Sequence, residues 1–123
     1  SSITPNLPAL TLALKTSKKA ASVGFDWANA DQVVEKVNEE LAELAAARTE
    51  NDAAHIEEEL GDLLLAVTNL ARHLQIDPER ALRSANQKFT SRFERLEQLL
   101  ASQNKEWSEL DISELEKRWQ KIK

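Results

Sequence analysis

Turn-forming residues are scarce in this chain, whose 123 residues include only two glycines and three prolines. Folds built from many short strands depend on tight turns, which these residues favour, so an all-β architecture is excluded and helices are expected. The glycine-rich loops that hold phosphates in α/β folds are also missing. A chain of this length is expected to form one domain of ordinary size.

Charge and composition exclude several functional classes. Lysine and arginine total 16 against 21 aspartate and glutamate, so the net charge of −5 argues against broad contact with nucleic acid. The absence of cysteine excludes disulfides, thiol catalysis and zinc or iron–sulfur sites that need thiolates. The longest apolar run, Leu63–Val67, is far shorter than the roughly 20 residues of a membrane span. With no secretion signal pattern, we expect a cytoplasmic protein without membrane contact.

Apolar residues recur with helical spacing over four long segments and one short one. Residues 1–8 are expected to form an arm or linker remnant, ahead of a single domain at 9–123. The predicted helices cover residues 9–24, 29–48, 53–75, 77–100 and 113–123, with Asn29 and Asp77 as N-caps. We therefore predict an all-α bundle of four main helices plus a C-terminal helix.

The second and third predicted helices carry the clearest apolar stripes. The stripe residues are Val34, Val37, Leu41 and Leu44 in the second helix, and Ile56, Leu60, Leu63, Val67, Leu70 and Leu74 in the third. Leu64 widens the stripe of the third helix and Leu65 points away from it. Such a wide apolar surface is expected to be covered on more than one side, by the bundle or by a second subunit.

Carboxylates border these stripes in pairs. Glu40 and Glu43 share one face of the second helix, as Glu59 and Asp62 share one face of the third. Glutamate runs on helices are usually solvated, but carboxylates at the rim of a core are costly unless paired or bound to metal. If the two helices pack antiparallel, the four side chains converge into an all-oxygen site suited to Mg²⁺ or Mn²⁺.

Several further residues have a structural and a functional interpretation. Gly61, inside a helix, suggests close approach by a ligand or another helix, and Lys36 suits either an ion pair with Glu40 or a phosphate contact. Lys88 and Arg92 form either a solvated basic face or an anion clamp, and Trp119 either belongs to the core or stacks on a base. His55 and His73 have no glutamate three residues before them, so the Glu-x-x-His signature of di-iron bundles is absent.

These motifs together resemble one known family, the MazG nucleoside triphosphate pyrophosphohydrolases, and within it the C-terminal domain of the tandem-domain bacterial members. The similarity covers nearly the whole chain. It is carried by Val23–Trp27 (VGFDW), Glu40–Glu43 (ELAE), Glu59–Leu64 (ELGDLL), Asn69–Leu74 (NLARHL), and Asn86–Phe89 (NQKF) with Arg92 and Phe93.

The resemblance implies an all-α homodimer that cleaves nucleoside triphosphates between the α and β phosphates, giving the monophosphate and pyrophosphate. By position, the Mg²⁺ ligands would be Glu40, Glu43, Glu59 and Asp62, with Mn²⁺ as a substitute. Glu39 and Glu40 would be catalytic, and Glu39 and Glu58 would flank the ligands and orient them or the attacking water. The nucleotide and its phosphates would be contacted by Lys36, Glu58, Asn86, Lys88, Arg92 and Trp119.

Two other interpretations stay open at this point. A related all-α pyrophosphohydrolase with a narrow substrate, such as dUTP, dCTP or phosphoribosyl-ATP, would share the fold. A non-catalytic helical module with an acidic interaction face would differ in having no stabilisation by Mg²⁺. For an enzyme, either removal of non-canonical nucleotides or control of nucleotide pools would fit the chemistry.

Overall fold

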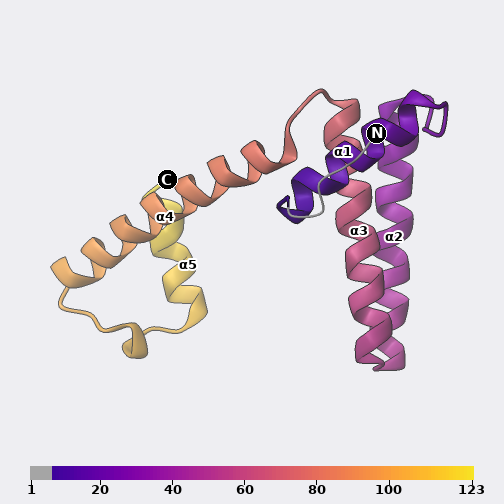
Figure 1. Cartoon of the computed structure of the whole chain (residues 1–123). Coiled ribbons are helices and arrows are strands. Elements are labelled where there is room, and N and C mark those ends of the chain that lie inside the picture. The colour runs from indigo at the N-terminus through magenta and orange to yellow at the C-terminus, as the bar shows by residue number, and fades with distance from the viewer. Residues whose placement is uncertain (1–6) are drawn as a thin grey trace. The chain divides into compact units, whose positions relative to one another are not determined.

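The computed structural model of this protein describes residues 7–123, which are helical throughout apart from turns and short loops. The elements are α1 (Ala9–Ser22), α2 (Ala30–Glu50), α3 (Ala53–His73), α4 (Pro78–Ser102), the 3₁₀ segment η1 (Trp107–Glu109) and α5 (Ile112–Lys121), as Figure 1 shows. The predicted all-α class, with four main helices and a C-terminal helix, is confirmed. Most of the predicted arm, residues 1–6, lies outside the described range. Between residues 7 and 123, no helix is long and apolar enough to cross a membrane.

Local sequence signals fix most helix ends. The predicted caps are confirmed, because the Asn29 side chain accepts a hydrogen bond from the backbone of Gln32 at 3.0 Å and Asp77 accepts one from Glu79 at 3.0 Å. The end of α1 is followed by Gly24 at a φ of +88°, a conformation that glycine adopts without strain. The second helix continues two residues beyond its predicted end, to Glu50, and stops where Asn51 turns left-handed.

Two other boundaries differ from the prediction. The third helix ends at His73, two residues early, and Gln75 takes a positive φ in the turn that follows. The short segment η1 was not expected. It is held by a capping box between Glu106 and Glu109, in which each side chain accepts from the other residue's backbone, a local pattern that apolar periodicity does not detect.

The chain divides into two compact units, one ending at Ala81 and the other covering Leu82–Lys123. In the first unit, α2 and α3 lie side by side as an antiparallel hairpin, and α1 packs against α3 (Figure 1). The buried residues of this hairpin are Val33, Glu40, Ala47, Glu59, Ala66 and Thr68. In the second unit, Leu96 and Leu100 of α4 are buried.

The predicted apolar stripes are only partly the buried faces. Val34 and Leu41 of α2 and Leu60 and Val67 of α3 are exposed, as is Leu74 beyond the end of α3. The α2 side of the contact instead runs through Val33, Glu40 and Ala47, which are spaced seven residues apart. A seven-residue spacing gives a narrow seam between paired helices, so the flanking leucines and valines stay outside it.

A polar cluster ties the loop after α1 to the end of α3. The Asp26 carboxylate accepts a hydrogen bond from Arg72 at 2.9 Å and lies 3.0 Å from Nε2 of His73. Arg72 also donates through Nε to the hydroxyl of Ser17 on α1, at 3.0 Å. The Arg72 hydrogen bond holds the pKa of Asp26 well below its usual range, so this carboxylate favours the folded state when it is charged.

From the ion pair between Asp26 and Arg72 we predict a stability that depends on pH. Asp26→Asn should lower the free energy of unfolding by about 1–2 kcal/mol at pH 7, because a charge-assisted bidentate contact is lost. The folded-state pKa is depressed, so the contribution is present above the unfolded value of about 4 and fades as pH falls below it. Urea unfolding of both proteins from pH 7 to pH 3 should show the gap beginning to narrow below about pH 4, whereas a gap that does not change with pH would contradict the assignment.

Candidate metal centre

Two glutamates lie inside the contact between α2 and α3. Glu40 is 5% exposed and Glu59 is 9% exposed, which is deeper than the rim positions predicted from the sequence. Within the described residues, the Oε2 atoms of both side chains are buried and have no hydrogen-bond partner. Buried carboxylate oxygens without partners are costly, so the solvated-face interpretation does not apply to these two residues.

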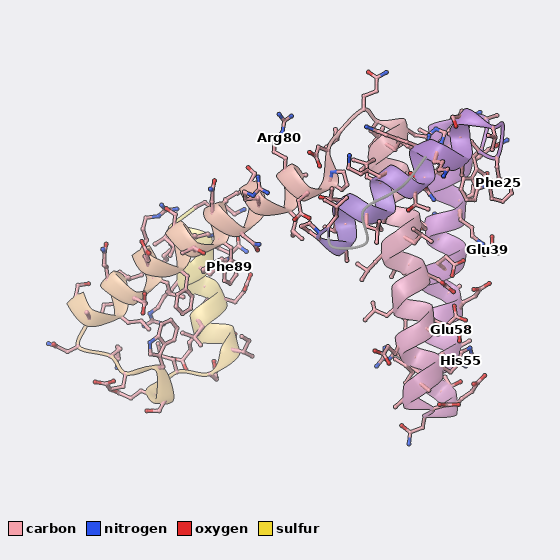
Figure 2. The ribbon with its side chains drawn as sticks, in the orientation of Figure 1. Phe25, Glu39, His55, Glu58, Arg80 and Phe89 are labelled. Atoms are coloured by element: carbon pink, nitrogen blue, oxygen red, sulfur yellow. The ribbon has the colours of Figure 1, made fainter. Side chains whose placement is uncertain are left out.

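The carboxylates around them form two groups. Glu40, Glu43 and Glu59 each offer an oxygen within 4.8 Å of the others, and Glu58, Glu59 and Asp62 do the same. The four side chains predicted to converge are therefore divided between two groups that share Glu59, and Asp62 is grouped with Glu58 and Glu59 rather than with Glu40 and Glu43. Glu39 and Glu58 lie along the same hairpin (Figure 2), and both are exposed.

Repulsion between the carboxylates of the first group changes the pKa of one of them. The negative charge of Glu40, followed by desolvation and by Glu59, raises the pKa of Glu43 above its ordinary value. A proton therefore binds this group more readily than it binds an isolated glutamate. A divalent cation would neutralise the same charge without a proton.

Two basic side chains contact the buried carboxylates. The Lys36 ammonium lies 2.9 Å from Oε1 of Glu40 and 3.6 Å from Glu39, and the hydrogen bond with Glu40 raises the pKa of Lys36. His55 lies 3.2 Å from Oε1 of Glu59 through Nε2 and 2.8 Å from Glu50 through Nδ1. The hydrogen bond with Glu50 raises the pKa of His55. The contact of His55 with Glu59 was not predicted, although the spacing of four residues between them on one helix was a usable signal.

The donor set fits a hard divalent cation. Both groups offer only carboxylate oxygens, which suit Mg²⁺ and Mn²⁺, and the two buried unpartnered oxygens are acceptors that no protein donor satisfies. The residues that could hold such ions are Glu40, Glu43, Glu58, Glu59 and Asp62. Gly61 beside them has open space where a Cβ would lie, so no other helix within residues 7–123 accounts for this glycine.

The predicted nucleotide-binding residues of the C-terminal part lie in the second unit. Asn86 and Lys88 are exposed. Arg92 is engaged, because its guanidinium donates to the backbone carbonyl of Trp119 and lies 4.2 Å from the centre of that ring. The Trp119 ring also lies 5.2 Å from Phe89. The contact of Trp119 with a base stays a prediction.

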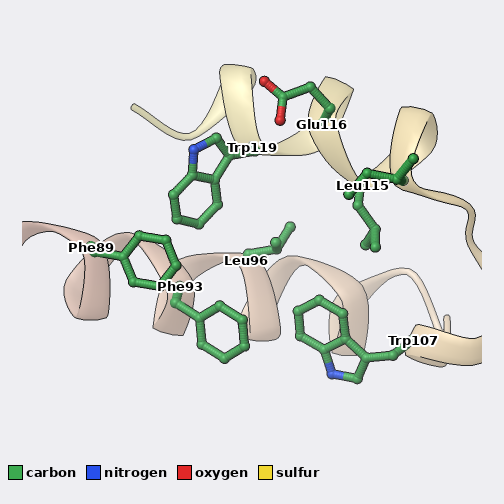
Figure 3. Close-up of a pocket in the computed structure, with 8 residues that line it drawn as sticks. Phe89, Phe93, Leu96, Trp107, Leu115, Glu116 and Trp119 are labelled. Carbon is green, nitrogen blue, oxygen red and sulfur yellow. The ribbon is translucent and has the colours of Figure 1, made fainter. Parts of the chain in front are cut away.

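An aromatic cleft of about 290 Å³ occupies this unit between α4 and α5 (Figure 3). Phe93 and Trp107 stack on each other at 5.3 Å on the α4 side of the cleft, and Trp119 lines it from α5. The core interpretation of Trp119 therefore accounts for its contacts within this unit. The phosphate role of Lys88 and Arg92 stays a prediction.

Comparison with known proteins identifies the family. A family model described as the MazG nucleotide pyrophosphohydrolase domain matches residues 29–96, which contain both carboxylate groups. The chain belongs to the MazG family. It is 44% identical over 121 residues to the nucleoside triphosphate pyrophosphohydrolase/pyrophosphatase MazG of Thermotoga maritima, and 45% identical over 120 residues to the nucleoside triphosphate pyrophosphohydrolase of Escherichia coli K12.

These MazG relatives are longer proteins. The alignments cover 98% and 96% of this chain but 46% of each relative, so the chain spans about half the length of the curated relatives it matches. The shared region includes the α2–α3 hairpin with its carboxylates and most of α4.

The repulsion among the carboxylates predicts a stability that depends on divalent cations. Saturating Mg²⁺ should raise the free energy of unfolding of this MazG domain, by about 2.7 kcal/mol at 100 times the dissociation constant. Glu59→Gln should raise the Tm of the metal-free protein, because a neutral amide replaces the shared charge, and should abolish the gain from Mg²⁺. Thermal melts in EDTA and in Mg²⁺ measure both effects.

A matched control is available on α2. Glu35→Gln removes one negative charge from an exposed position outside both groups, so it should keep the full gain from Mg²⁺. An equal loss of the gain in Glu35→Gln and Glu59→Gln would mean that Mg²⁺ acts through overall charge rather than through this site.

Proposed function

We propose that this MazG domain hydrolyses nucleoside triphosphates to the monophosphate and pyrophosphate, using Mg²⁺ held by Glu40, Glu43, Glu59 and Asp62. The observation that carries the proposal is the pair of buried, unpartnered oxygens of Glu40 and Glu59 within converging carboxylates. The printed names of the Thermotoga maritima and Escherichia coli relatives, which describe nucleoside triphosphate pyrophosphohydrolases, support the same substrate class. We expect Mn²⁺ to substitute, because it accepts the same oxygen ligands.

The proposed reaction is an in-line attack of water. Bound Mg²⁺ would supply the positive charge that neutralises the triphosphate and lowers the pKa of a coordinated water. The water oxygen forms a bond to the α-phosphorus while the bond from phosphorus to the α–β bridging oxygen breaks, and pyrophosphate leaves with that oxygen. The proton released by the water passes to a carboxylate.

Glu39 is the residue that we assign to accept this proton. It is adjacent to Glu40, but its own side chain is 59% exposed and so can reach a water at the edge of the site. Glu58 is likewise exposed and adjacent to Glu59. It would orient the substrate at the group that it forms with Glu59 and Asp62. Glu40 would hold Mg²⁺ through its negative charge and its unpartnered Oε2 atom.

Basic side chains would hold the phosphates. The Lys36 ammonium contacts Glu40, so it would lie close to a phosphate group of a substrate bound at these carboxylates. The side chains of Asn86 and Lys88 on α4 are exposed, so their side-chain donors are accessible. Arg92 would bind a phosphate only by sharing the guanidinium that now contacts Trp119.

Neutralising one ligand should remove activity and leave the fold. In a product assay with nucleoside triphosphates and Mg²⁺, Asp62→Asn should lower kcat by more than the roughly 100-fold loss typical of residues behind metal ligands. Circular dichroism should be unchanged, because Asp62 is exposed. Full activity of Asp62→Asn would contradict the assigned ligand set.

The same assay defines the bond cleaved and the substrate range. Pyrophosphate and monophosphate, lost on chelation, are the expected products across a panel of ribonucleotides and deoxyribonucleotides. Orthophosphate as the product would contradict the proposal. Turnover confined to dUTP or dCTP would instead assign the domain to the narrow-substrate alternative.

We further propose a homodimer, which the resemblance to the family implied. On α3, Leu60, Leu64 and Val67 form a stripe with helical spacing, and each side chain is at least 44% exposed. Leu65, which is 47% exposed, lies on a different face of α3. A second copy of the chain would bury the stripe, and burial of a leucine side chain contributes about 1.5–3 kcal/mol.

Sedimentation provides the measurement for this dimer. The wild type should sediment as a dimer, and Leu64→Asp should shift it to a monomer because a charge would be buried at the contact. Ile112→Asp on α5, which is also exposed, is the matched control and should stay dimeric. A monomeric wild type would contradict the proposal.

A further inference from the structure

The two buried carboxylates are held in the same way. Glu40 has its Oε1 atom 2.9 Å from the Lys36 ammonium, and Glu59 has its Oε1 atom 3.2 Å from Nε2 of His55. In both residues it is the other oxygen, Oε2, that is buried without a partner among the described residues. One oxygen of each carboxylate therefore contacts a basic side chain, and the second is buried without a partner among the described residues.

His55 is itself anchored from two sides. Its backbone N–H donates to the Asp52 cap at 3.3 Å, and its Nδ1 atom lies 2.8 Å from Oε2 of Glu50 at the end of α2. Carboxylate oxygens accept hydrogen bonds, so Glu50 fixes the ring and directs Nε2 toward Glu59. Figure 2 shows His55 and Glu58 close together on α3, on the hairpin that carries the carboxylates.

The orientation of Glu59 matters more than that of its neighbours. It is the one residue common to both carboxylate groups within residues 7–123, so a rotation of its side chain would disturb both. A glutamate side chain has three rotatable bonds, and a hydrogen bond to one oxygen removes most of that freedom before an ion arrives. Residues behind metal ligands act by this kind of orientation.

We propose that His55 is a positioning residue for the metal centre, which holds Oε1 of Glu59 so that Oε2 remains turned into the two carboxylate groups. This inference rests on the proposed function, because it presupposes that the carboxylates bind a divalent cation. His55 would act by orienting Glu59 and would not contact the substrate.

Charge and orientation predict opposite effects of removing His55. A protonated imidazole near a cation repels it, so loss of charge alone would tighten metal binding. Loss of orientation would weaken it. A variant that keeps an N–H donor but carries no charge separates the two effects, and glutamine can reach a carboxylate four residues further along a helix.

The experiment measures binding of Mn²⁺ alone to the whole chain, by the electron paramagnetic resonance signal of the free ion. His55→Ala should weaken Mn²⁺ binding roughly tenfold, and His55→Gln should stay within about threefold of the wild type. His73→Ala is the matched control, because it removes the other histidine, which contacts Asp26 rather than the carboxylate groups. Its Mn²⁺ affinity should not change.

The outcomes distinguish the two levels of the proposal. A wild type that binds no Mn²⁺ would overturn the metal centre and the role of His55 together. A wild type that binds Mn²⁺ while His55→Ala binds equally well or better would overturn the role of His55 alone. An equal loss in His55→Ala and His55→Gln would also overturn it, since the donated hydrogen bond would not be the cause. Titrations below the lowest Tm of the set keep all variants folded.

Discussion

The burial of Glu40 and Glu59 is the constraint on which the rest of this structure depends. Charged side chains in the seam of a helical hairpin oppose the association of the helices unless something compensates them. Lys36 and His55 compensate one oxygen of each, and the remaining oxygens have no protein partner between residues 7 and 123. The hairpin is therefore less stable than an apolar one would be, and the proposed divalent cation would compensate the charge that the protein leaves uncompensated.

Helix caps and the hydrogen bonds of Arg72 stabilise the first unit outside the contact between α2 and α3. Asn29 and Asp52 cap the starts of α2 and α3, each contributing about 1 kcal/mol by the usual effect of such caps. Arg72 joins α1, the loop at Asp26 and the end of α3 through charge-assisted hydrogen bonds. The side chains that make these contacts lie outside the two carboxylate groups.

Much of the fold followed from the sequence because its signals are local. Asn29 and Asp77 were recognisable as caps from their position before helical periodicity, and Gly24 as a stop. The buried faces were less predictable. Periodicity gives the spacing of apolar residues, but a helix that is apolar over a wide arc does not reveal which part meets its neighbour, and the stripe residues Leu41 and Leu60 are exposed in this chain.

The candidate site was predictable to a similar degree. The i,i+3 pairs of acids identified the carboxylate groups, but their depth depends on the seam and required the structure. The contact of His55 with Glu59 was not predicted because the spacing tested was three residues, while this contact spans four. Arg92 donates a hydrogen bond to the backbone carbonyl of Trp119, which lies 27 residues further along the chain. Local sequence patterns do not predict such a tertiary contact.

The membership of Glu59 in both carboxylate groups has a consequence for cooperativity. Two cations held by these groups would share one ligand, so occupancy of the first position would alter the charge and orientation available to the second. Under the proposed function, the groups would therefore form a single thermodynamic unit, in which the two binding events would be linked by a coupling free energy. A substitution at Glu59 would then affect both ions, whereas Glu43 and Asp62 each belong to one group and can be varied separately.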